Sequence, residues 1–246
     1  ENIKKAAALC RELGFDGIDI NMGCPDKSVE KQFAGAAMIK NPKLARKIIR
    51  AAKEGADGLP ISVKTRIGYN KDEIETWIPE LLKENLAALT VHLRTCQEMS
   101  NAPAHWDLMK RIVKIRDEMK KETLILGNGD VLDLEDAKQK IKESGCDGVM
   151  FGRAIFGNPW LFVGGKRQDL GNSKRSCLEE PAFPSLQEKL KVMLEHTKLF
   201  EKILGSHKNF TIMKKHYKAY VNGFNGAKGL RMKLMSAENA TQIEII

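Results

Sequence analysis

The sequence lacks three features that would assign it to a common class of protein. No stretch of its 246 residues approaches the roughly 18 consecutive apolar residues of a membrane-spanning helix. No CxxC pair occurs, and the five cysteines are scattered and odd in number, which argues against a disulfide framework. The first residues mix charged and apolar side chains, unlike a signal peptide. We therefore expect a cytoplasmic protein with free thiols.

The charge of the chain is positive, with 41 Lys and Arg against 32 Asp and Glu and a net charge of +9. A lysine-rich solvated surface and a polyanionic partner such as RNA both account for this balance. Charge alone does not separate them. The hydrophobic share of 42% and the charged share of 30% suit one large globular domain, or a domain with a small appendage.

Five short apolar runs alternate with helical patterns over the first two thirds of the chain. The runs are continuous and rich in Ile, Val and Leu, as expected for parallel strands covered on both faces. They span residues 17–21, 60–66, 88–94, 123–129 and 147–152. The alternation predicts consecutive βα units and therefore an α/β protein with a parallel sheet.

Helical patterns fill the segments between these runs, at residues 42–54, 72–86, 106–119 and 133–144. Asp133 is placed to cap the start of the last one, and Gly145 to end it. Gly55 marks the expected end of the first. Pro79 is expected to kink or divide the segment that contains it.

Polar side chains follow the carboxyl end of every predicted strand. No GxGxxG motif follows any strand, which weakens the alternative of an open dinucleotide-binding sheet. Five consecutive strands that bring polar groups to one edge are typical of a (β/α)8 TIM barrel, whose active site is built from the loops at that edge. We expect the last five βα units of such a barrel, with three strands preceding Glu1. The polar groups are Asn21 with Cys24, Lys64 with Arg66, His92 with Arg94, Asn128 with Asp130, and Gly152 with Arg153.

The alternation stops near residue 163. The next segment is rich in Gly, Pro, Ser and charge, which indicates a linker or a long loop. After it only helical patterns return. The sequence therefore predicts a partial barrel at 1–165, a linker at 166–185 that contains Cys177, and a helical domain at 186–246.

The last two βα units have the composition of a phosphate-binding site. Barrels often hold phosphate on the loops after their last two strands, where glycines allow close approach to backbone N–H groups. Gly129 in GNGD and Gly152 in FGRAIFGNP lie in those loops, and Arg153 follows. Either glycine alone is more commonly a simple turn residue. Both together favour a phosphate.

Lys64 and His92 extend this candidate site. Lys64 lies in an otherwise apolar strand, and burying an unpaired ammonium group is costly, so we expect an anionic or carbonyl-rich ligand beside it. A lone histidine such as His92 is more commonly structural, but next to Lys64 and a phosphate loop a ligand contact is favoured. Flavin mononucleotide would use the whole set, with its phosphate on the glycine loops and its ring and ribityl chain against Lys64 and His92.

Taken in order, five motifs resemble those of the tRNA-dihydrouridine synthases: DINMGCPDKSV, VKTRIG, VHLRT, GNGD and GVMFGRAIFGNPWLF. The tail KKHYKAYVNGFNGAKGLRMKLM resembles the small helical domain of that family. The resemblance implies an FMN-bearing barrel that reduces the C5=C6 bond of a uridine in tRNA. In that family NADPH reduces the flavin, the flavin passes a hydride to C6, and a cysteine protonates C5.

The resemblance also implies roles for individual residues. The cysteine of the family's GCP motif corresponds to Cys24, which would be the general acid. The implied FMN-binding residues are Lys64, His92, Asn128, Gly129, Asp130, Gly152 and Arg153. The implied substrate contacts are Asn21, Arg66 and Arg94.

Two parts of the sequence depart from the family pattern. The segment CQEMSNAPAHWD at 96–107 lacks the aromatic residue and the glycine that the family commonly has there, and Leu93 replaces a glycine. We expect substrate contacts to differ on this side. The family's first strands, which carry further flavin contacts, would precede Glu1.

The basic helical tail is a candidate surface for the tRNA backbone, because lysine contacts to phosphate give affinity without base specificity. Its basic residues are Lys208, Lys214, Lys215, His216, Lys218, Lys228, Arg231 and Lys233, around Tyr217 and Tyr220. A solvated helical face is the alternative. The target base would have to leave its stack to reach Cys24.

Two other functions remain open. One is an FMN-dependent barrel oxidoreductase that acts on a free small molecule of the dihydroorotate or enone type, which would not need the basic tail. The other is a non-catalytic RNA-binding remnant, against which the joint presence of Cys24, Lys64 and His92 argues. We expect a monomer with no metal ion and no membrane partner.

Overall fold

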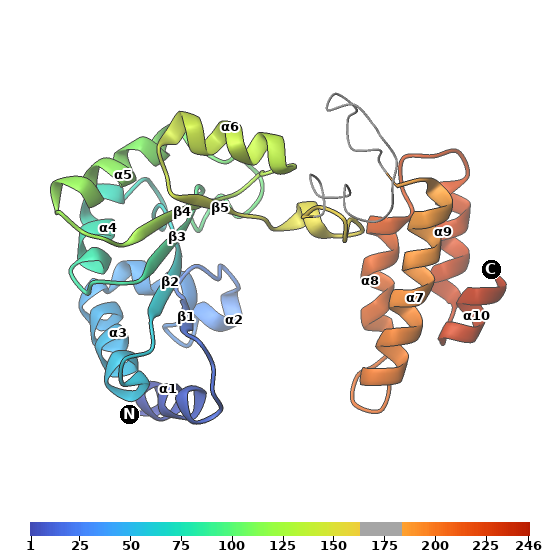
Figure 1. The fold of residues 1–246 in the computed structure, drawn as a ribbon, viewed down its shortest axis with the longest axis horizontal. Coiled ribbons are helices and arrows are strands. Elements are labelled where there is room, and N and C mark those ends of the chain that lie inside the picture. Colours follow the sequence, from blue (N-terminus) through green and yellow to red (C-terminus); the bar gives the residue numbers. More distant parts are fainter. Residues whose placement is uncertain (163–183) are drawn as a thin grey trace, which may run out of the picture. The chain divides into compact units, whose positions relative to one another are not determined.

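The computed structural model describes residues 1–162 and 184–246 (Figure 1). These residues form two compact units, Glu1–Gly152 and Arg153–Ile246. The predicted linker at 166–185 lies outside the described residues except for its last positions, and so does Cys177. None of the helices in the described ranges is long and apolar enough to cross a membrane.

The first unit is built on one five-stranded parallel sheet with the strand order β1-β2-β3-β4-β5. All five predicted runs form strands, which confirms the α/β class. The strands are β1 (Ile18–Asn21), β2 (Ile61–Arg66), β3 (Ala88–His92), β4 (Leu124–Asn128) and β5 (Gly148–Met150). They form five consecutive βα units, the repeat from which a (β/α)8 barrel is built.

The register of the sheet brings the polar strand ends side by side. Asn21 of β1 pairs with Lys64 of β2. Arg66 of β2 pairs with His92 of β3, and His92 pairs in turn with Asn128 of β4. Because all the strands are parallel, these residues share one edge of the sheet. The sequence predicted this shared edge.

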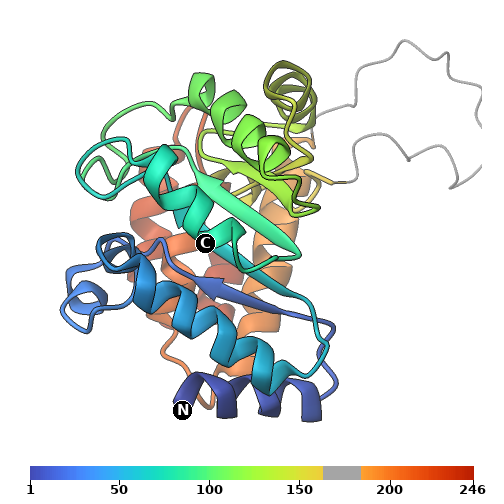
Figure 2. The same cartoon turned by 90° about the vertical axis from the view of Figure 1, so that its left-hand side faces the viewer.

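Helices cover the outer face of the curved sheet, as Figures 1 and 2 show for α3 to α6. The helices of the first unit are α1 (Asn2–Glu12), α2 (Lys27–Glu30), α3 (Pro42–Ala56), α4 (Ile74–Leu82), α5 (Met109–Glu118) and α6 (Leu134–Ser144). Short 3-10 helices are η1 (Gly35–Lys40), η2 (Trp106–Leu108) and η3 (Arg153–Ile155), the last in the second unit. The sequence patterns did not predict α2 and η1, which lie in the loop between β1 and α3.

The helix ends follow the local chemistry of the sequence, with two corrections. Asp133 caps α6 by accepting a hydrogen bond from a backbone N–H, and Gly145 ends it in the left-handed conformation, as predicted. The expected end of α3 at Gly55 is wrong, because the helix continues to Ala56 and Asp57 takes the left-handed position. The helix α4 continues through Pro79, so the expected division is wrong, while the expected kink stays a prediction.

The core of the first unit lies between the sheet and its helices and reaches the strand-end edge through Trp77. This side chain of α4 is only 1% exposed. Its Nε1 donates to the hydroxyl of Thr65 at 2.9 Å, and that hydroxyl lies 3.2 Å from the carbonyl of Met22 in the loop after β1. Packing of α4 against the sheet therefore also supports the loop that carries Cys24.

The second unit is helical, as the sequence predicted. It contains α7 (Leu186–Leu204), α8 (Thr211–Tyr220), α9 (Ala227–Ser236) and α10 (Ala240–Ile245). A capping box of Ser185 and Glu188 begins α7. Tyr217 and Tyr220, expected among the surface lysines, are buried in the core of this unit. Their hydroxyls lie near Thr197 and His196.

We expect Trp77→Ala to lower the free energy of unfolding of the first unit by about 3–5 kcal/mol, because it empties a large buried volume. Trp77→Phe keeps most of that volume and loses one hydrogen bond, so its cost should be nearer 1 kcal/mol. Urea unfolding followed by circular dichroism measures both. Equal stability of the two variants would contradict a close-packed role for this side chain.

Candidate active site at the carboxyl ends of the strands

The loop after β1 holds the backbone of Cys24 from two directions. The Oδ1 atom of Asn21 accepts hydrogen bonds from the N–H groups of Gly23 and Cys24, at 3.0 and 3.2 Å. The carbonyl of Cys24 accepts from the N–H of Ala36 at 2.9 Å. The Cys24 side chain is half-buried. Asn21, predicted as a substrate contact, thus has its carbonyl oxygen engaged in shaping the turn.

Gly35 packs directly against this loop, and sequence reasoning missed it. Its φ is +58°, and a Cβ there would lie 2.7 Å from the carbonyl oxygen of Cys24 and 3.0 Å from its Cβ. Any other residue would displace Cys24. The only signal in the sequence is the glycine itself, in a loop where no secondary structure was predicted.

Arg66 joins the loops that follow β1 and β3. Its side chain is 6% exposed, and its guanidinium donates to the carbonyl oxygens of Gly23 at 2.8 Å and Thr95 at 2.9 Å. Burial is the largest cause that lowers the pKa of Arg66, and the charge of Arg94 adds to it. The N–H groups of Arg66 thus donate to the protein's own backbone carbonyls.

Arg94 and Asp130 form a second internal link. The Nη2 atom of Arg94 donates to the Asp130 carboxylate, and its Nε donates to the carbonyl of Ala102. The same Asp130 carboxylate accepts from the N–H of Ala104 at 2.9 Å. These contacts fasten the loop after β3 to the end of β4. Asp130 was predicted to bind FMN and Arg94 the substrate, and those roles stay predictions.

His92 lies in a positively charged and partly buried environment. Burial is the main cause that lowers its pKa to about 3, and the charges of Arg66, Lys64 and Arg94 lower it further, while Asp130 opposes them. The imidazole is therefore neutral at physiological pH. Its Nε2 lies 3.1 Å from the Arg94 guanidinium, which can only donate, so Nε2 accepts and Nδ1 carries the proton.

Lys64 is half-buried, and its ammonium group makes no hydrogen bond or ion pair with the residues that the structure describes. Burial lowers its pKa first, and the charge of Arg66 lowers it further, while Asp19 partly opposes both. A desolvated ammonium group of this kind gains from an anionic or carbonyl ligand. Of the predicted ligand contacts in the first unit, Lys64 has the clearest need for one.

The loops after β4 and β5 differ in how tightly they are packed. Asn128 donates from Nδ2 to the carbonyl of Met150 at 2.8 Å. Gly129 has φ of +119°, and a Cβ there would lie 2.9 Å from Ala104 and 3.2 Å from the His92 ring. Gly152 is exposed, and no atom lies within 4 Å of the position that its Cβ would take.

Two further residues complete the description of these loops. Trp106, which the sequence analysis did not assign to the site, donates from Nε1 to the Gly129 carbonyl at 2.8 Å. Arg153 is exposed, begins η3 and belongs to the second unit.

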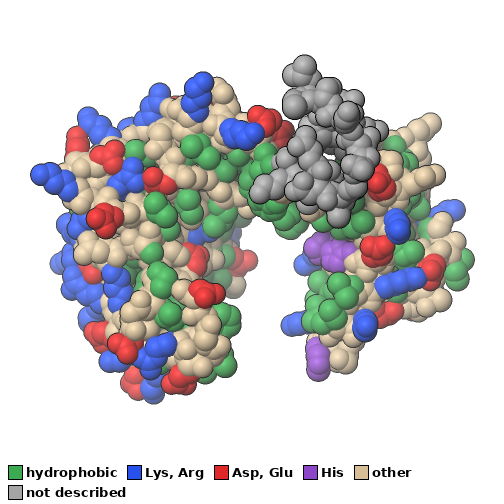
Figure 3. Space-filling model, in the orientation of Figure 1, with side chains coloured by type: hydrophobic (Ala, Val, Ile, Leu, Met, Phe, Trp, Pro, Cys, Tyr) green, Lys and Arg blue, Asp and Glu red, His purple; other side chains and the backbone are tan. Residues whose placement is uncertain are grey.

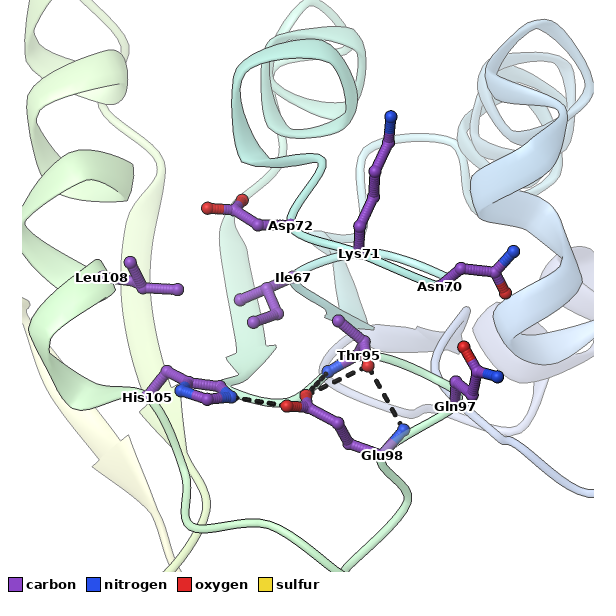
Figure 4. Close-up of a pocket in the computed structure, with 9 residues that line it drawn as sticks. All are labelled: Ile67, Asn70, Lys71, Asp72, Thr95, Gln97, Glu98, His105 and Leu108. Atoms are coloured by element: carbon purple, nitrogen blue, oxygen red, sulfur yellow. Dashed lines mark hydrogen bonds and ion pairs between the residues drawn. The ribbon is translucent and has the colours of Figure 1, made fainter.

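A cavity of about 360 Å³ lies between the loops after β2 and β3 (Figure 4). Glu98 lines one side of the cavity. Its carboxylate accepts a hydrogen bond from the N–H of Thr95 at 2.7 Å and lies 2.7 Å from Nε2 of His105. The lining residues are Ile67, Asn70, Lys71, Asp72, Thr95, Gln97, Glu98, His105 and Leu108. The loop after β3 contains the segment that departs from the family pattern, but no pattern in the sequence predicts a cavity there.

The residues at the strand ends fit an FMN-like ligand. Gly129 presents backbone without a side chain beside His92, as a phosphate or ribityl contact requires. Lys64 supplies a desolvated cation, and His92 a neutral N–H donor. No three His, Cys, Asp or Glu side chains among the described residues are grouped so as to hold a metal ion.

Comparison with known proteins agrees with this arrangement. The family model described as "Dihydrouridine synthase (Dus)" matches residues 1–245. The chain belongs to the dihydrouridine synthase family. The "Probable tRNA-dihydrouridine synthase 2" of Bacillus subtilis is 37% identical over 248 residues, which cover 100% of this chain and 71% of the relative. A "Probable tRNA-dihydrouridine synthase" of Staphylococcus epidermidis is 37% identical over 98% of this chain and 70% of its own.

Two solved structures are similar to part of this dihydrouridine synthase family member. Morphinone reductase in complex with tetrahydroNAD has a TM-score of 0.47 at 18% identity, over 66% of this chain and 46% of the other. An old yellow enzyme homologue from Zymomonas mobilis has a TM-score of 0.46 at 18% identity, over 66% of this chain and 49% of the other.

In this family member we expect Gly129→Ala to lower the free energy of unfolding by about 1–3 kcal/mol, because alanine is strained at this φ and its Cβ would press on His92. Gly152→Ala is the matched control in the other glycine loop, and it should change stability by no more than about 0.5 kcal/mol. Thermal unfolding compares the two. A larger loss for Gly152→Ala would contradict the packing described here.

The low pKa of His92 makes a pH-dependent contribution to stability. The unfolded chain binds a proton at this histidine below its ordinary pKa of 6.5, whereas the folded protein resists it down to about 3. The contribution is therefore complete above pH 6.5 and is lost as the pH falls toward 3. Urea unfolding at several pH values should show that His92→Gln weakens this acid sensitivity. An unchanged pH dependence would contradict the assigned environment.

Proposed function

We propose that this protein is a tRNA-dihydrouridine synthase, an oxidoreductase that reduces the C5=C6 bond of a uridine in tRNA. Membership of the dihydrouridine synthase family over nearly the whole chain supports the reaction class. The observation that carries the mechanism is the fixed backbone of Cys24. Hydrogen bonds of the Cys24 backbone with Asn21 and Ala36 hold this residue, with its half-buried side chain, at the same edge as Lys64 and His92.

We propose FMN as the cofactor and NADPH as its reductant. When bound, FMN would supply the hydride that uracil C6 receives. Lys64 would place its ammonium group against an anionic or carbonyl edge, and His92 would offer its Nδ1–H as a donor. The remaining proposed FMN contacts are Asn128, Gly129, Asp130, Gly152 and Arg153.

Cys24 is the proposed general acid. Reduction of a C=C bond needs a hydride at one carbon and a proton at the other, and the Cys24 thiol would donate that proton to C5. The thiolate left behind would regain a proton from solvent. The turn made by Asn21 fixes the thiol's origin, and Gly35 leaves no room for the loop to shift toward η1. Such fixing of a reacting group accounts for much of an enzyme's rate enhancement.

The proposed substrate is tRNA, whose uridine would leave its stack to reach Cys24. Exposed lysines in the second unit, including Lys215, Lys218 and Lys228, are candidates for phosphate contacts. Figure 3 shows further Lys and Arg side chains over the helix-covered side of the first unit. The backbone carbonyls that Arg66 and Arg94 already bind make direct substrate contact by these two residues secondary in this proposal. A tRNA substrate is consistent with the cytoplasmic location that the sequence predicts.

The test uses protein expressed from its complete reading frame, examined for flavin absorption and then given NADPH and unmodified tRNA. Mass spectrometry of the tRNA should show a gain of two hydrogen atoms at one uridine. Cys24→Ala should keep the flavin and lose about 10²–10⁴-fold in rate, the usual contribution of a general acid. Cys10→Ala, on α1, is the matched control and should keep full activity.

Each other result favours a different function. Flavin without modified tRNA, but with reduction of a free enone or dihydroorotate-type compound, would replace this proposal by a small-molecule oxidoreductase. Binding of tRNA without any flavin would favour a non-catalytic RNA-binding protein. A fully active Cys24→Ala variant would leave the reaction in place and refute the role of this thiol.

A further inference from the structure

Glu30 links the loop of Cys24 to two other loops at the strand-end edge. It is the last residue of α2, six positions after Cys24. Its Oε1 accepts a hydrogen bond from the thiol of Cys96 at 2.9 Å, and its Oε2 accepts one from the hydroxyl of Tyr69 at 2.9 Å. Cys96 follows β3 and Tyr69 follows β2, so one carboxylate joins three loops.

Backbone hydrogen bonds join the loops that carry the two donors, Cys96 and Tyr69. The N–H of Cys96 donates to the carbonyl of Gly68 at 2.9 Å, and the N–H of Gln97 donates to the carbonyl of Tyr69 at 3.0 Å. The ammonium group of Lys40 lies 3.3 Å from the centre of the Tyr69 ring, which holds that ring from η1. Backbone hydrogen bonds therefore join the loops after β2 and β3, and Glu30 is attached to both of these loops.

Cys96 is suited to be a permanent donor. It is 5% exposed, and burial, followed by its hydrogen bond to Glu30, raises the pKa of its thiol to about 12. The thiol thus keeps its proton at any physiological pH. The hydroxyl of Tyr69 donates to the other oxygen, so the carboxylate of Glu30 has a charge-assisted bond on each oxygen.

The segment that Glu30 holds has little stability of its own. The helix α2 is a single turn of four residues, which does not persist alone in water. Asp26 caps its start by accepting from the N–H of Ser28 at 2.8 Å, and Cys24 lies just before that cap. Glu30 supplies the corresponding attachment at the far end. The N–H of Ala36, which donates to the Cys24 carbonyl, is a second attachment of this segment.

We propose that Glu30 is a positioning residue for Cys24, held by the Cys96 thiol and the Tyr69 hydroxyl. This inference rests on the proposed function, in which Cys24 donates a proton to the uracil ring. Glu30 touches neither substrate nor cofactor in this proposal. It keeps the start of α2, and with it Cys24, in a fixed position relative to the sheet while tRNA binds. A shift of the thiol by about 1 Å can cost up to 10²-fold in rate.

The two halves of the catalytic cycle separate this role from a general loss of structure. In the proposed function Cys24 would have no role while NADPH reduces the bound flavin, and it would donate its proton only when tRNA is reduced. We expect Glu30→Ala to slow reoxidation by about 10–100-fold, as for a displaced reacting group, and to leave reduction within about 2-fold. Rapid-mixing absorbance at the flavin band measures both rates on the same sample.

Conservative variants should slow flavin reoxidation to different extents. Glu30→Gln keeps the shape and one acceptor oxygen, so reoxidation should fall less than in Glu30→Ala. Cys96→Ser keeps a donor and should stay near the wild-type rate, whereas Cys96→Ala should slow reoxidation. Cys146→Ala is the matched control, because Cys146 is also a buried thiol, donating to the Gly148 carbonyl at 3.2 Å before β5. It should lose stability comparably and leave both rates unchanged.

A second measurement does not need turnover. The rate of Cys24 alkylation by iodoacetamide, read by mass spectrometry of the peptide that contains it, should differ by several-fold between wild type and Glu30→Ala. It should not differ between wild type and Cys146→Ala. An unchanged alkylation rate in a folded Glu30→Ala protein would overturn the inference, as would equal slowing of both half-reactions.

Failure of the proposed function would look different. If wild-type protein does not modify tRNA while Glu30→Ala still changes the alkylation of Cys24, the attachment of the loop stands and the reaction is wrong. If wild type modifies tRNA and Glu30→Ala changes neither reoxidation nor alkylation, the reaction stands and the positioning role is refuted.

Discussion

The buried guanidinium of Arg66 is the interaction on which the strand-end edge depends. Removing such a group from water is costly. Hydrogen bonds from Arg66 to backbone carbonyls of two different loops offset this cost. One of those loops carries Cys24 and the other carries Cys96. A single side chain at the end of β2 therefore supports the loops of both cysteines. The charge of this group also sets the electrostatics of its surroundings, since it lowers the pKa of His92 and of Lys64.

The polar residues at this edge divide into a scaffold and a reactive set. Arg66, Arg94 and Asp130 direct their hydrogen bonds to the protein itself. Lys64 and the thiol of Cys24 make no side-chain hydrogen bond with the residues that the structure describes, and His92 keeps one N–H to donate. The edge carries three cationic side chains, one of them paired with the Asp130 carboxylate, and a neutral imidazole, so its remaining positive charge favours an anionic ligand. The electrostatics and the proposed cofactor thus agree.

The strands, their order and the shared polar edge were predictable from the sequence, because continuous apolar runs and their terminal residues are local signals. The caps of α6 were predictable for the same reason. The positions of Gly35, Glu30 and Trp106 were not, because their importance arises from contacts between loops that are distant in sequence. In the sequence, Arg66 and Arg94 cannot be distinguished from arginines that bind a ligand. Only the folded structure reveals that carbonyls of neighbouring loops occupy them.

The contact of Trp77 with Thr65, and of Thr65 with Met22, connects the interior of the first unit to the loop of Cys24. Fluctuations of the core on warming would reach the thiol through these two contacts before the sheet itself separates. Catalysis would then fail at a lower temperature than folding. The thermal range of such an enzyme would then depend on the packing of Trp77 as well as on its melting point.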